Sequence, residues 1–264
     1  MQNPKQEVVE NYGDNISFNS ILNFRDAGGL STISGGSVRK GIIYRSANPD
    51  RISKKDIKSL KKLGIKTIVD LRAPGEFRKR KAEIPDIEVI NLPLDFEGVT
   101  RQRIRPLIKR NFNPDEIDKT INELYLEIID AAGPVLAKIA GLLLIPDKTP
   151  LLIHCQAGKD RTGILAAMLQ MIAGAEKEEI VRDYMASNDS LVPYFSRKLS
   201  IRTILTFGLF PSAAILHAVK QKERDIETVI ERIEERYGGI KEYISVSGFN
   251  VSDFDRLRDI LREG

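Results

Sequence analysis

The sequence predicts an α/β fold with a central, mostly parallel sheet that is flanked by helices. The first observation behind this prediction is the alternation, up to about residue 160, of short β-branched or apolar runs with segments of helical periodicity. The second is that the chain after residue 161 has helical periodicity almost throughout. Alternating strands and helices favour right-handed crossovers between parallel strands. In such sheets ligands bind beyond the carboxyl ends of the strands, so we expect a site there.

The first predicted elements are strands and one helix. An apolar run at 41–45 follows the glycine-rich turn at 34–36 and predicts a strand. Ser53 is a favourable N-cap for a helix with Asp56 in its first turn, and Gly64 is expected to end that helix. Two β-branched runs predict further strands at 66–71 and 87–92.

A long helical segment precedes the next strand. Asn113 and Pro114 suit the cap and the first position of a helix. We expect that helix to reach about Ala132, where Gly133 and Pro134 should break it before a second helix continues to residue 144. The apolar run at 150–153 then predicts a buried strand.

The remaining pattern is helical. A helix is expected to begin near Arg161 and to end at Gly174. The last helix is expected to have Ser252 as its cap and Asp255 at its third position. The helices predicted over this part of the chain cover 161–174, 176–186, 199–221, 223–236 and 252–262.

Composition favours one globular unit. The chain has 264 residues, of which 42% are hydrophobic and 30% charged, which allows a large core. We expect a flexible N-terminal tail at 1–15 and a single domain at 16–264. The net charge of +4 suits anionic partners, such as phosphorylated substrates, anionic lipid or nucleic acid, without choosing among them. A solvated surface rich in Lys and Glu explains this charge equally well.

The single cysteine, Cys155, cannot form a disulfide within the chain, which suits a reducing compartment and favours a cytoplasmic location. The first residues lack the apolar segment of a secretory signal. The longest apolar stretch, 203–219, contains Pro211 and His217 and is too short to span a bilayer. We therefore expect no integral membrane association. The oligomeric state is not indicated by the sequence.

A dense polar motif lies between the strand at 150–153 and the helix that begins near residue 161. It reads His154-Cys155-Gln156-Ala157-Gly158-Lys159-Asp160-Arg161-Thr162-Gly163. A loop wound around a helix N-terminus points backbone N–H groups inward and adds the positive end of the helix dipole, so it forms a nest for an anion. Gly158 can adopt the positive φ that such a loop needs, and Ala157 is small. We expect residues 156–161 to bind a substrate phosphate.

The same motif contains a candidate nucleophile and a candidate phosphate clamp. A thiol at Cys155 is expected to lose its proton readily beside a helix N-terminus and cationic groups, and its thiolate can attack phosphorus in line. Arg161, after five intervening residues, offers a planar fork to two phosphate oxygens. Thr162 can donate to the sulfur when it leaves, and His154 and Gly163 are expected to support the loop. A lone cysteine at a strand end is usually a small buried hydrophobic residue. Here six positions of the motif fit the chemistry together, namely His154, Cys155, Gly158, Arg161, Thr162 and Gly163, and this favours catalysis.

These residues resemble the signature of the protein-tyrosine phosphatases, a Cys and an Arg separated by five residues and followed by Ser or Thr. The Gly-Lys-Asp-Arg-Thr-Gly version is similar to an atypical microbial branch with activity on phosphotyrosine and phosphoinositides. Segments at 23–29, 44–47, 70–72 with Glu76, and 237–239 with Tyr243 resemble further motifs of that branch, so the resemblance covers about 18–262.

The resemblance implies a cysteine-phosphatase fold, a phosphocysteine intermediate, and neither a metal nor a cofactor. It also implies a helical lid over the pocket at about 189–222, where Gly208 and Pro211 could serve as hinges; ordinary core packing is the alternative for this apolar segment. The expected substrates are phosphorylated proteins, with activity on phosphoserine and phosphothreonine besides phosphotyrosine, or phosphoinositides.

Two acidic residues are candidates for the general acid that protonates the leaving oxygen. Asp160 lies in the loop, and the resemblance favours it. Asp70 ends a strand on the side where ligands bind, although it could instead brace the loop through Arg72 or Lys159. Lys159 could bind a second phosphate of a polyphosphorylated substrate or act only through the electrostatics of the loop.

Other functions fit the sequence less well. Arsenate reductases that share this loop need additional cysteines, and sulfurtransferases have a shorter loop. A nucleic-acid binder is disfavoured because the chain has no Trp and its aromatic residues show no pattern with the basic ones. The alternatives that stay open are a non-catalytic phosphate-binding module and a phosphatase of small molecules or inositol phosphates.

Overall fold

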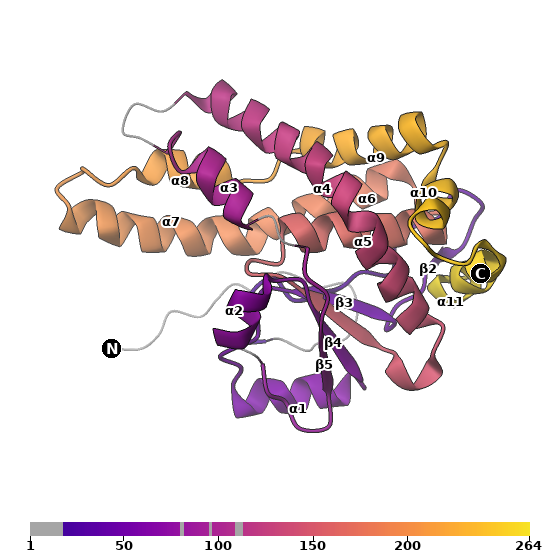
Figure 1. The fold of residues 1–264 in the computed structure, drawn as a ribbon. Helices are drawn as coiled ribbons and strands as arrows, with labels where there is room; N and C mark the ends of the chain where they lie inside the picture. Colours follow the sequence, from indigo (N-terminus) through magenta and orange to yellow (C-terminus); the bar gives the residue numbers. More distant parts are fainter. Residues whose placement is uncertain (1–17, 80–81, 95–96, 109–112) are drawn as a thin grey trace.

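The computed structural model describes residues 18–79, 82–94, 97–108 and 113–264; the expected tail at 1–15 lies outside these residues. The described part contains a five-stranded sheet with the order β1-β3-β6-β4-β5. β3, β6, β4 and β5 run parallel, and β1 pairs with β3 in the antiparallel direction. This arrangement confirms the predicted α/β fold (Figure 1). In this order, the strands are Arg25–Asp26, Ile43–Ser46, Leu151–His154, Thr67–Asp70 and Glu88–Asn91.

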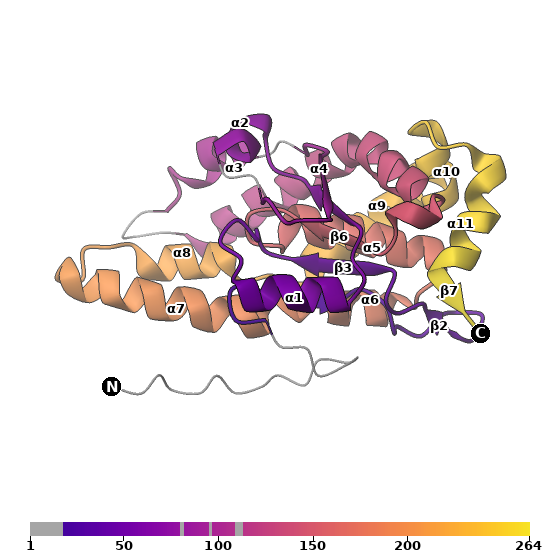
Figure 2. The same ribbon diagram turned by 90° about the horizontal axis from the view of Figure 1, so that it is seen from below.

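Helices lie on both faces of the sheet, and successive strand residues point to opposite faces. On β4, Ile68 joins the smaller apolar cluster together with Leu60 of α1 (Lys54–Lys62), while the next residue, Val69, joins the larger cluster. Leu152 and Ile153 divide between the two clusters in the same way on β6. Figures 1 and 2 show α1 on one side of the sheet and the long helices on the other.

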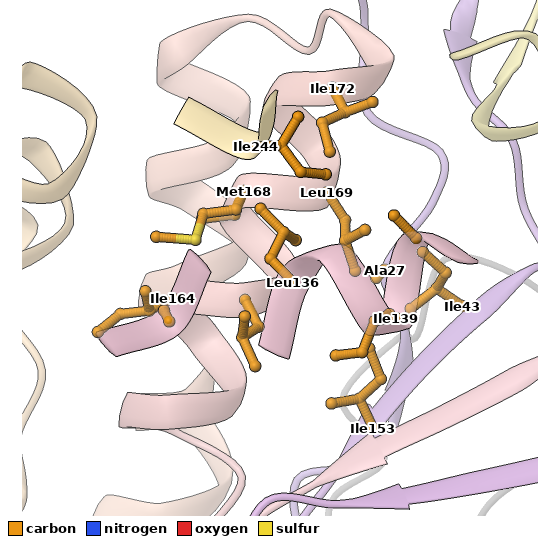
Figure 3. Close-up of a cluster of buried hydrophobic side chains, with 14 of the residues drawn as sticks. Ala27, Ile43, Leu136, Ile139, Ile153, Ile164, Met168, Leu169, Ile172 and Ile244 are labelled. Carbon is orange, nitrogen blue, oxygen red and sulfur yellow. The ribbon is translucent and has the colours of Figure 1, made fainter. Parts of the chain in front are cut away.

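The larger core is built around α5 (Asp160–Ala173), which is buried on nearly all sides. α4 (Pro114–Leu143) and α10 (Ile240–Val246) pack against it, and Figure 3 shows Leu136, Met168 and Ile244 meeting at their contact. A helix held on all sides has a fixed N-terminus. The loop that precedes α5 is therefore anchored between the central strand β6 and the most buried helix.

The other helices surround this core. α9 packs along α4 and α6, whereas α7 and α8 form a hairpin that projects from the body of the molecule in both views (Figures 1 and 2). A small second sheet joins β2 (Ser37–Val38) to β7 (Arg262–Glu263). The remaining helices are α2 (Pro74–Lys79), α3 (Glu97–Ile104), α6 (Lys177–Met185), α7 (Ser187–Leu205), α8 (Ser212–Val219), α9 (Glu223–Tyr237) and α11 (Phe254–Leu261), with short 3-10 turns at Pro146–Lys148 and Val251–Asp253.

The predicted break at Gly133 and Pro134 is wrong, because α4 continues through both residues. Gly133 lies so close to α10 that an added Cβ would come within 2.0 Å of the Ser247 hydroxyl oxygen. The Tyr243 hydroxyl donates to the carbonyl of Ile129 at 2.5 Å, one turn before the proline. Buried packing on α10 therefore outweighs the hydrogen bond that Pro134 cannot make.

Two helix boundaries also differ from the prediction. The single helix expected at 199–221 is two helices, since a turn with positive φ at Phe207 and Gly208 separates α7 from α8. The last helix is not capped by Ser252. A 3-10 turn comes first, in which the Asn250 side chain accepts from the backbone N–H of Ser252, and α11 begins only at Phe254.

Candidate active site

The loop at 155–159 follows the central strand of the sheet and leads directly into α5. His154, the last residue of β6, lies in register with Ser46 of β3 on one side and with Asp70 of β4 on the other. The loop therefore begins where the carboxyl ends of three parallel strands meet. This is the position at which open parallel sheets bind ligands.

Gly158 fixes the path of the loop. Its φ is +69°, and an added Cβ would lie 2.3 Å from the backbone carbonyl of Ser46. The Asn23 amide and the Arg45 guanidinium donate to the carbonyl of Gly158 at 2.9 and 3.1 Å. Only glycine fits this conformation and this close approach, so the loop lies tightly against β3.

A buried cluster of charges supports the loop from behind. Asp183 of α6 accepts from Arg25 at 2.7 Å and from Arg45 at 2.7 Å. Burial raises the pKa of Asp183, but the two guanidinium groups outweigh burial and lower it to about 2. Arg45 is fully buried and also reaches the loop, so the cluster links α6 and β3 to the candidate phosphate nest. Gly163 makes room for it, since an added Cβ would lie 3.1 Å from Arg45.

The two central residues of the motif face the same pocket. Cys155 and Arg161 both line a pocket of 520 Å³, although each is less than a tenth exposed. One terminal nitrogen of Arg161 donates weakly to the carbonyl of Leu71 at 3.4 Å, which orients the guanidinium. The neighbouring Thr162 hydroxyl is buried and has no hydrogen-bond partner among the residues that the structure describes. Its expected donation to the Cys155 sulfur is therefore not made in this state.

Asp70 is held away from the pocket. Its carboxylate accepts from the Arg72 side chain at 2.6 and 3.0 Å and from the Arg72 backbone N–H at 2.9 Å. Burial raises the pKa of Asp70, but the hydrogen bonds from Arg72 more than offset this, so the net pKa is below its ordinary value. Asp70 and Arg72 are both about 1% exposed or less, and neither lines the pocket. This geometry corresponds to the bracing alternative.

His154 lies between the strands and the loop. Its Nε2 is 3.6 Å from the Asp70 carboxylate, which is too long for a hydrogen bond, and its Nδ1 is 3.2 Å from the carbonyl of Cys155. Burial lowers the pKa of His154 to about 4, so the imidazole is neutral at pH 7. A neutral ring with Nδ1 protonated donates to the Cys155 carbonyl and holds the start of the loop.

Asp160 is presented to the pocket by a different set of partners. Its Oδ1 accepts from the Tyr125 hydroxyl at 2.5 Å and from the Lys159 ammonium at 2.8 Å. The Tyr125 hydroxyl in turn lies 2.5 Å from that of Tyr184. Burial raises the pKa of Asp160, but the charge and hydrogen bond of Lys159 and the hydrogen bond of Tyr125 lower it below its ordinary value. The side chain keeps 36% of its surface exposed, so it stays accessible from the pocket.

Most of the pocket wall is apolar. α4 supplies one side, α8 another and α3 a third, and Arg105 just after α3 adds a charge at the wall. Apart from Arg105 and Tyr125, the polar lining residues belong to the loop or to the first turn of α5. The lining side chains are Ile104, Arg105, Ile108, Ile121, Leu124, Tyr125, Ile128, Cys155, Gln156, Ala157, Lys159, Asp160, Arg161, Ile215, Ala218 and Val219.

The structure brings together most of the residues that the motif predicted. Residues 155–157 and 159–161 line the pocket, whereas His154, Gly158, Thr162 and Gly163 lie behind it and Asp70 lies apart. Sequence reasoning missed Asp183 and Tyr125, each of which contacts the site from a distant helix. A single sequence carried no local signal for either residue, because each lies in an ordinary helical pattern.

A loop with a Cys and an Arg separated by five residues, between the central strand and a buried helix at the floor of a pocket, is the arrangement of a cysteine-dependent phosphatase. A family model described as "Tyrosine phosphatase family" matches residues 16–263. The chain therefore belongs to the tyrosine phosphatase family, and the expected class of enzyme, a protein-tyrosine phosphatase, is confirmed.

Curated relatives agree with this assignment. A Cupriavidus necator protein that carries the name of a tyrosine-protein phosphatase is 28% identical over 92% of this chain and 87% of its own length. The triple specificity protein phosphatase PtpB of Mycobacterium tuberculosis is 27% identical over 90% of this chain and 96% of its own length. Among solved structures, the core catalytic domain of the PP-IP phosphatase SIW14 from S. cerevisiae aligns with 61% of this chain and 75% of that one, at 18% identity and a TM-score of 0.33.

No helix in the described part of the chain is both long enough and apolar enough to cross a membrane.

Proposed function

We propose that this protein hydrolyses phosphate monoesters through a phosphocysteine intermediate, with phosphotyrosine as its main substrate class. The observation that carries the proposal is the position of Cys155 and Arg161 at the floor of one pocket, on a loop between β6 and the N-terminus of α5. Such a loop surrounds a dianion with backbone N–H groups and a helix dipole. We expect residues 156–161 to bind the phosphate oxygens.

In the first step the Cys155 thiolate attacks phosphorus, and the bond from phosphorus to the leaving oxygen breaks. Arg161 binds two equatorial oxygens, where charge accumulates in the transition state. Asp160 gives its proton to the leaving oxygen, so that a neutral alcohol or phenol departs. The products are the alcohol and a phosphocysteine.

In the second step water attacks the phosphocysteine, and Asp160 accepts the proton of that water. The bond from phosphorus to sulfur breaks, and the sulfur leaves as a thiolate. The Thr162 hydroxyl, which has no partner within the described residues, is expected to rotate and donate to that sulfur. Inorganic phosphate then dissociates, and no metal takes part in either step.

Asp160 is the better candidate for the general acid because it lines the pocket and Asp70 does not. In the free protein the lowered pKa leaves Asp160 ionised at pH 7. A bound phosphate dianion adds negative charge beside it and draws Lys159 toward itself, and both effects raise the pKa of Asp160 in the complex. Asp70 is assigned the bracing role through Arg72.

The pocket walls suit an aromatic leaving group. Phosphotyrosine would place its ring among apolar side chains of α4 and α8, such as Ile121 and Val219, with its phosphate on the loop. Lys159 and Arg105 are cationic residues that both line the pocket and could bind a second phosphate of a phosphoinositide. The relative PtpB is named a triple specificity phosphatase, which supports the proposal of phosphoserine, phosphothreonine and lipid substrates as secondary activities.

A reactive thiolate has to stay reduced, which favours a reducing compartment such as the cytoplasm. The division into one domain at 16–264 with a lid at about 189–222 stays a prediction. It is supported by the position of α8, whose residues Ile215, Ala218 and Val219 form one wall of the pocket.

The first experiment measures phosphate release from phosphotyrosine, phosphoserine and phosphoinositide substrates in EDTA, for the wild type and for Cys155→Ser. We expect release by the wild type that is insensitive to EDTA and falls to background in the variant. No release from any of these substrates by folded wild type would contradict the proposal. The chain would then be a phosphate-binding module or a phosphatase of small molecules.

A further inference from the structure

The hairpin of α7 and α8 ends in an exposed apolar surface. Nine large apolar side chains are exposed in the described part of the chain, and five of them lie between residues 201 and 209. Phe207 is 95% exposed, more than any of the others. We call these five side chains the hairpin tip; they are Ile201, Ile204, Leu205, Phe207 and Leu209. Contiguous exposed apolar side chains usually mark a contact surface.

The backbone N–H groups of this turn are satisfied within the hairpin. The N–H of Gly208 donates to the carbonyl of Thr203 at 2.8 Å, and that of Leu209 to the carbonyl of Thr206 at 3.0 Å. The N–H of Phe210 donates to the Thr206 hydroxyl at 3.1 Å. N–H groups that already have partners lower the cost of moving this turn into a less polar medium.

Phe207 adopts an unfavourable backbone conformation without any packing that would explain it. Its φ is +49°, in the left-handed region, which is an outlier for a bulky residue. Its ring nevertheless lies almost entirely in solvent. The turn thus holds an aromatic ring outward at the end of the hairpin, which points to a partner for that ring.

Apart from Asp189 in the first turn of α7, the charged residues of the hairpin are all basic. There is no Asp or Glu at 190–222, whereas the whole chain has 37 acidic residues among 264. Four cationic side chains on these helices or directly after α8 are exposed, and none of them forms an ion pair with a residue that the structure describes. They are Arg197, Lys198, Arg202 and Lys220. Exposed basic side chains beside an apolar tip are suited to a partner with an anionic surface and an apolar interior.

We propose that the hairpin tip docks on an anionic lipid surface, with Phe207 and its apolar neighbours entering the headgroup region and Arg197 and Arg202 contacting lipid phosphates. An amphipathic element with bulky apolar side chains and a cationic flank is the ordinary composition of an interfacial anchor. A second copy of the chain fits less well, because a two-fold contact through the tip would bring the same positive charges together.

The hairpin connects this surface to the pocket. α8 begins just after the tip and lines the pocket with Ile215, Ala218 and Val219 farther along. Figures 1 and 2 show the turn at the outer end of the hairpin, beyond the sheet. Docking would hold the pocket at the membrane, where phosphorylated lipids lie. This consequence for the substrate rests on the proposed function, whereas the docking itself does not.

Sedimentation with vesicles tests the docking directly. We expect the wild type to bind vesicles of phosphatidylcholine mixed with phosphatidylserine and not vesicles of phosphatidylcholine alone. Leu205→Ser/Phe207→Ser should weaken binding by about tenfold or more, because two apolar side chains no longer enter the lipid. Arg197→Gln/Arg202→Gln should reduce the preference for the anionic lipid. Ile33→Ser, which changes a side chain that is 80% exposed elsewhere, is the matched control.

A spectroscopic measurement locates the inserted residue. The chain has no Trp, so Phe207→Trp introduces a single tryptophan, whose emission can be excited selectively. We expect its emission to shift to shorter wavelength with anionic vesicles, while that of Ile33→Trp stays unchanged. Unaltered emission of Phe207→Trp, or vesicle binding by Leu205→Ser/Phe207→Ser equal to that of the wild type, would overturn the proposal.

Two further readouts separate the explanations. The first is sedimentation velocity without lipid. If a second copy of the chain binds the hairpin tip, the wild type should self-associate and Leu205→Ser/Phe207→Ser should not. That result would also overturn lipid docking. The vesicles contain no phosphoinositide, so Cys155→Ser should bind them as the wild type does. Failure of catalysis and failure of docking are therefore distinguishable.

Discussion

The two candidates for the general acid, Asp160 and Asp70, differ in their hydrogen-bond partners, and these partners decide which carboxylate reaches the pocket. Asp70 ends β4, and Asp160 begins α5 just after the loop that follows β6. Asp70 is enclosed by Arg72, and Asp160 is held by Tyr125 and Lys159 with part of its surface in the pocket. The sequence left the choice between them open, because Tyr125, which holds Asp160 at the pocket, lies on α4, 35 residues earlier in the chain.

Replacement of each acid gives a prediction at this scale. Asp160→Asn should lower kcat on phosphotyrosine by about 100-fold or more, and by much less for a substrate with a good leaving group. The pKa of Asp160 in the free protein is below its ordinary value. The kcat/KM of the wild type should therefore decrease with rising pH already in the acid range, and this decrease is the alkaline limb of its pH profile. This alkaline limb should disappear in Asp160→Asn.

Asp70→Asn is the matched comparison. It should retain the alkaline limb but destabilise the protein by roughly 2–3 kcal/mol, because the buried Arg72 guanidinium loses a carboxylate partner. The pH dependence of kcat/KM and thermal unfolding measure the two effects. If only Asp70→Asn abolished the alkaline limb, the general acid would be Asp70.

Among the elements, α6 has a structural role that its own sequence does not reveal. It supplies Asp183 to Arg25 of β1 and Arg45 of β3, and through Arg45 it supports Gly158. The pKa of Asp183 is depressed to about 2, so its stabilising contribution is present above the unfolded pKa of about 4 and is lost as the pH falls toward 2.

Asp183→Asn tests this contribution. We expect a loss of about 2–3 kcal/mol in the free energy of unfolding near pH 7, from a pKa shift of this size. The difference between wild type and variant should shrink as the pH falls from about 4 to about 2. Urea unfolding at several pH values measures it. A difference that stays constant over this range would mean that Asp183 stabilises the fold by packing rather than by charge.

Prediction from sequence succeeded for elements with a local pattern and failed where distant packing decides. The strands at 66–71 and 150–153 and the helix with the Ser53 cap were recognisable, because apolar periodicity and caps are local. β1, β2 and β7 have two residues each and exist only through their partners. α4 passes through Pro134 because α10, more than 100 residues later, packs against it.

The candidate site was predictable to the extent that it lies in one contiguous segment. Residues 154–163 appear together in the sequence, and the nest around Cys155 and Arg161 follows from them. The supporting residues Asn23, Tyr125 and Asp183 come from three other parts of the chain. Their meeting at the loop is a property of the folded molecule.

The molecule as a whole contains a single thiol. Cys155 is buried at the pocket floor, and no second cysteine exists in the chain to form a disulfide with it. We expect peroxide to inactivate the enzyme in proportion to oxidation of Cys155 and added thiol to restore activity only in part, because no internal thiol captures the sulfenic acid.

Activity after peroxide, with and without dithiothreitol, together with the intact mass of the protein, measures this effect. Phosphate bound in the pocket should slow the inactivation. Full resistance to peroxide would contradict a reactive thiolate at Cys155.

The strand order has a consequence for how the active site comes into being. β6 lies between β3 and β4 but follows both of them, and β5 as well, in the sequence. During synthesis β3 and β4 therefore leave the ribosome before β6, the strand that pairs with both of them. The candidate phosphate loop follows directly after β6. The strand that joins the two halves of the sheet therefore also places the candidate phosphate loop at its edge. We expect the sheet and the start of this loop to form together, whereas Tyr125 of α4 and Asp183 of α6 complete the site only when those helices pack.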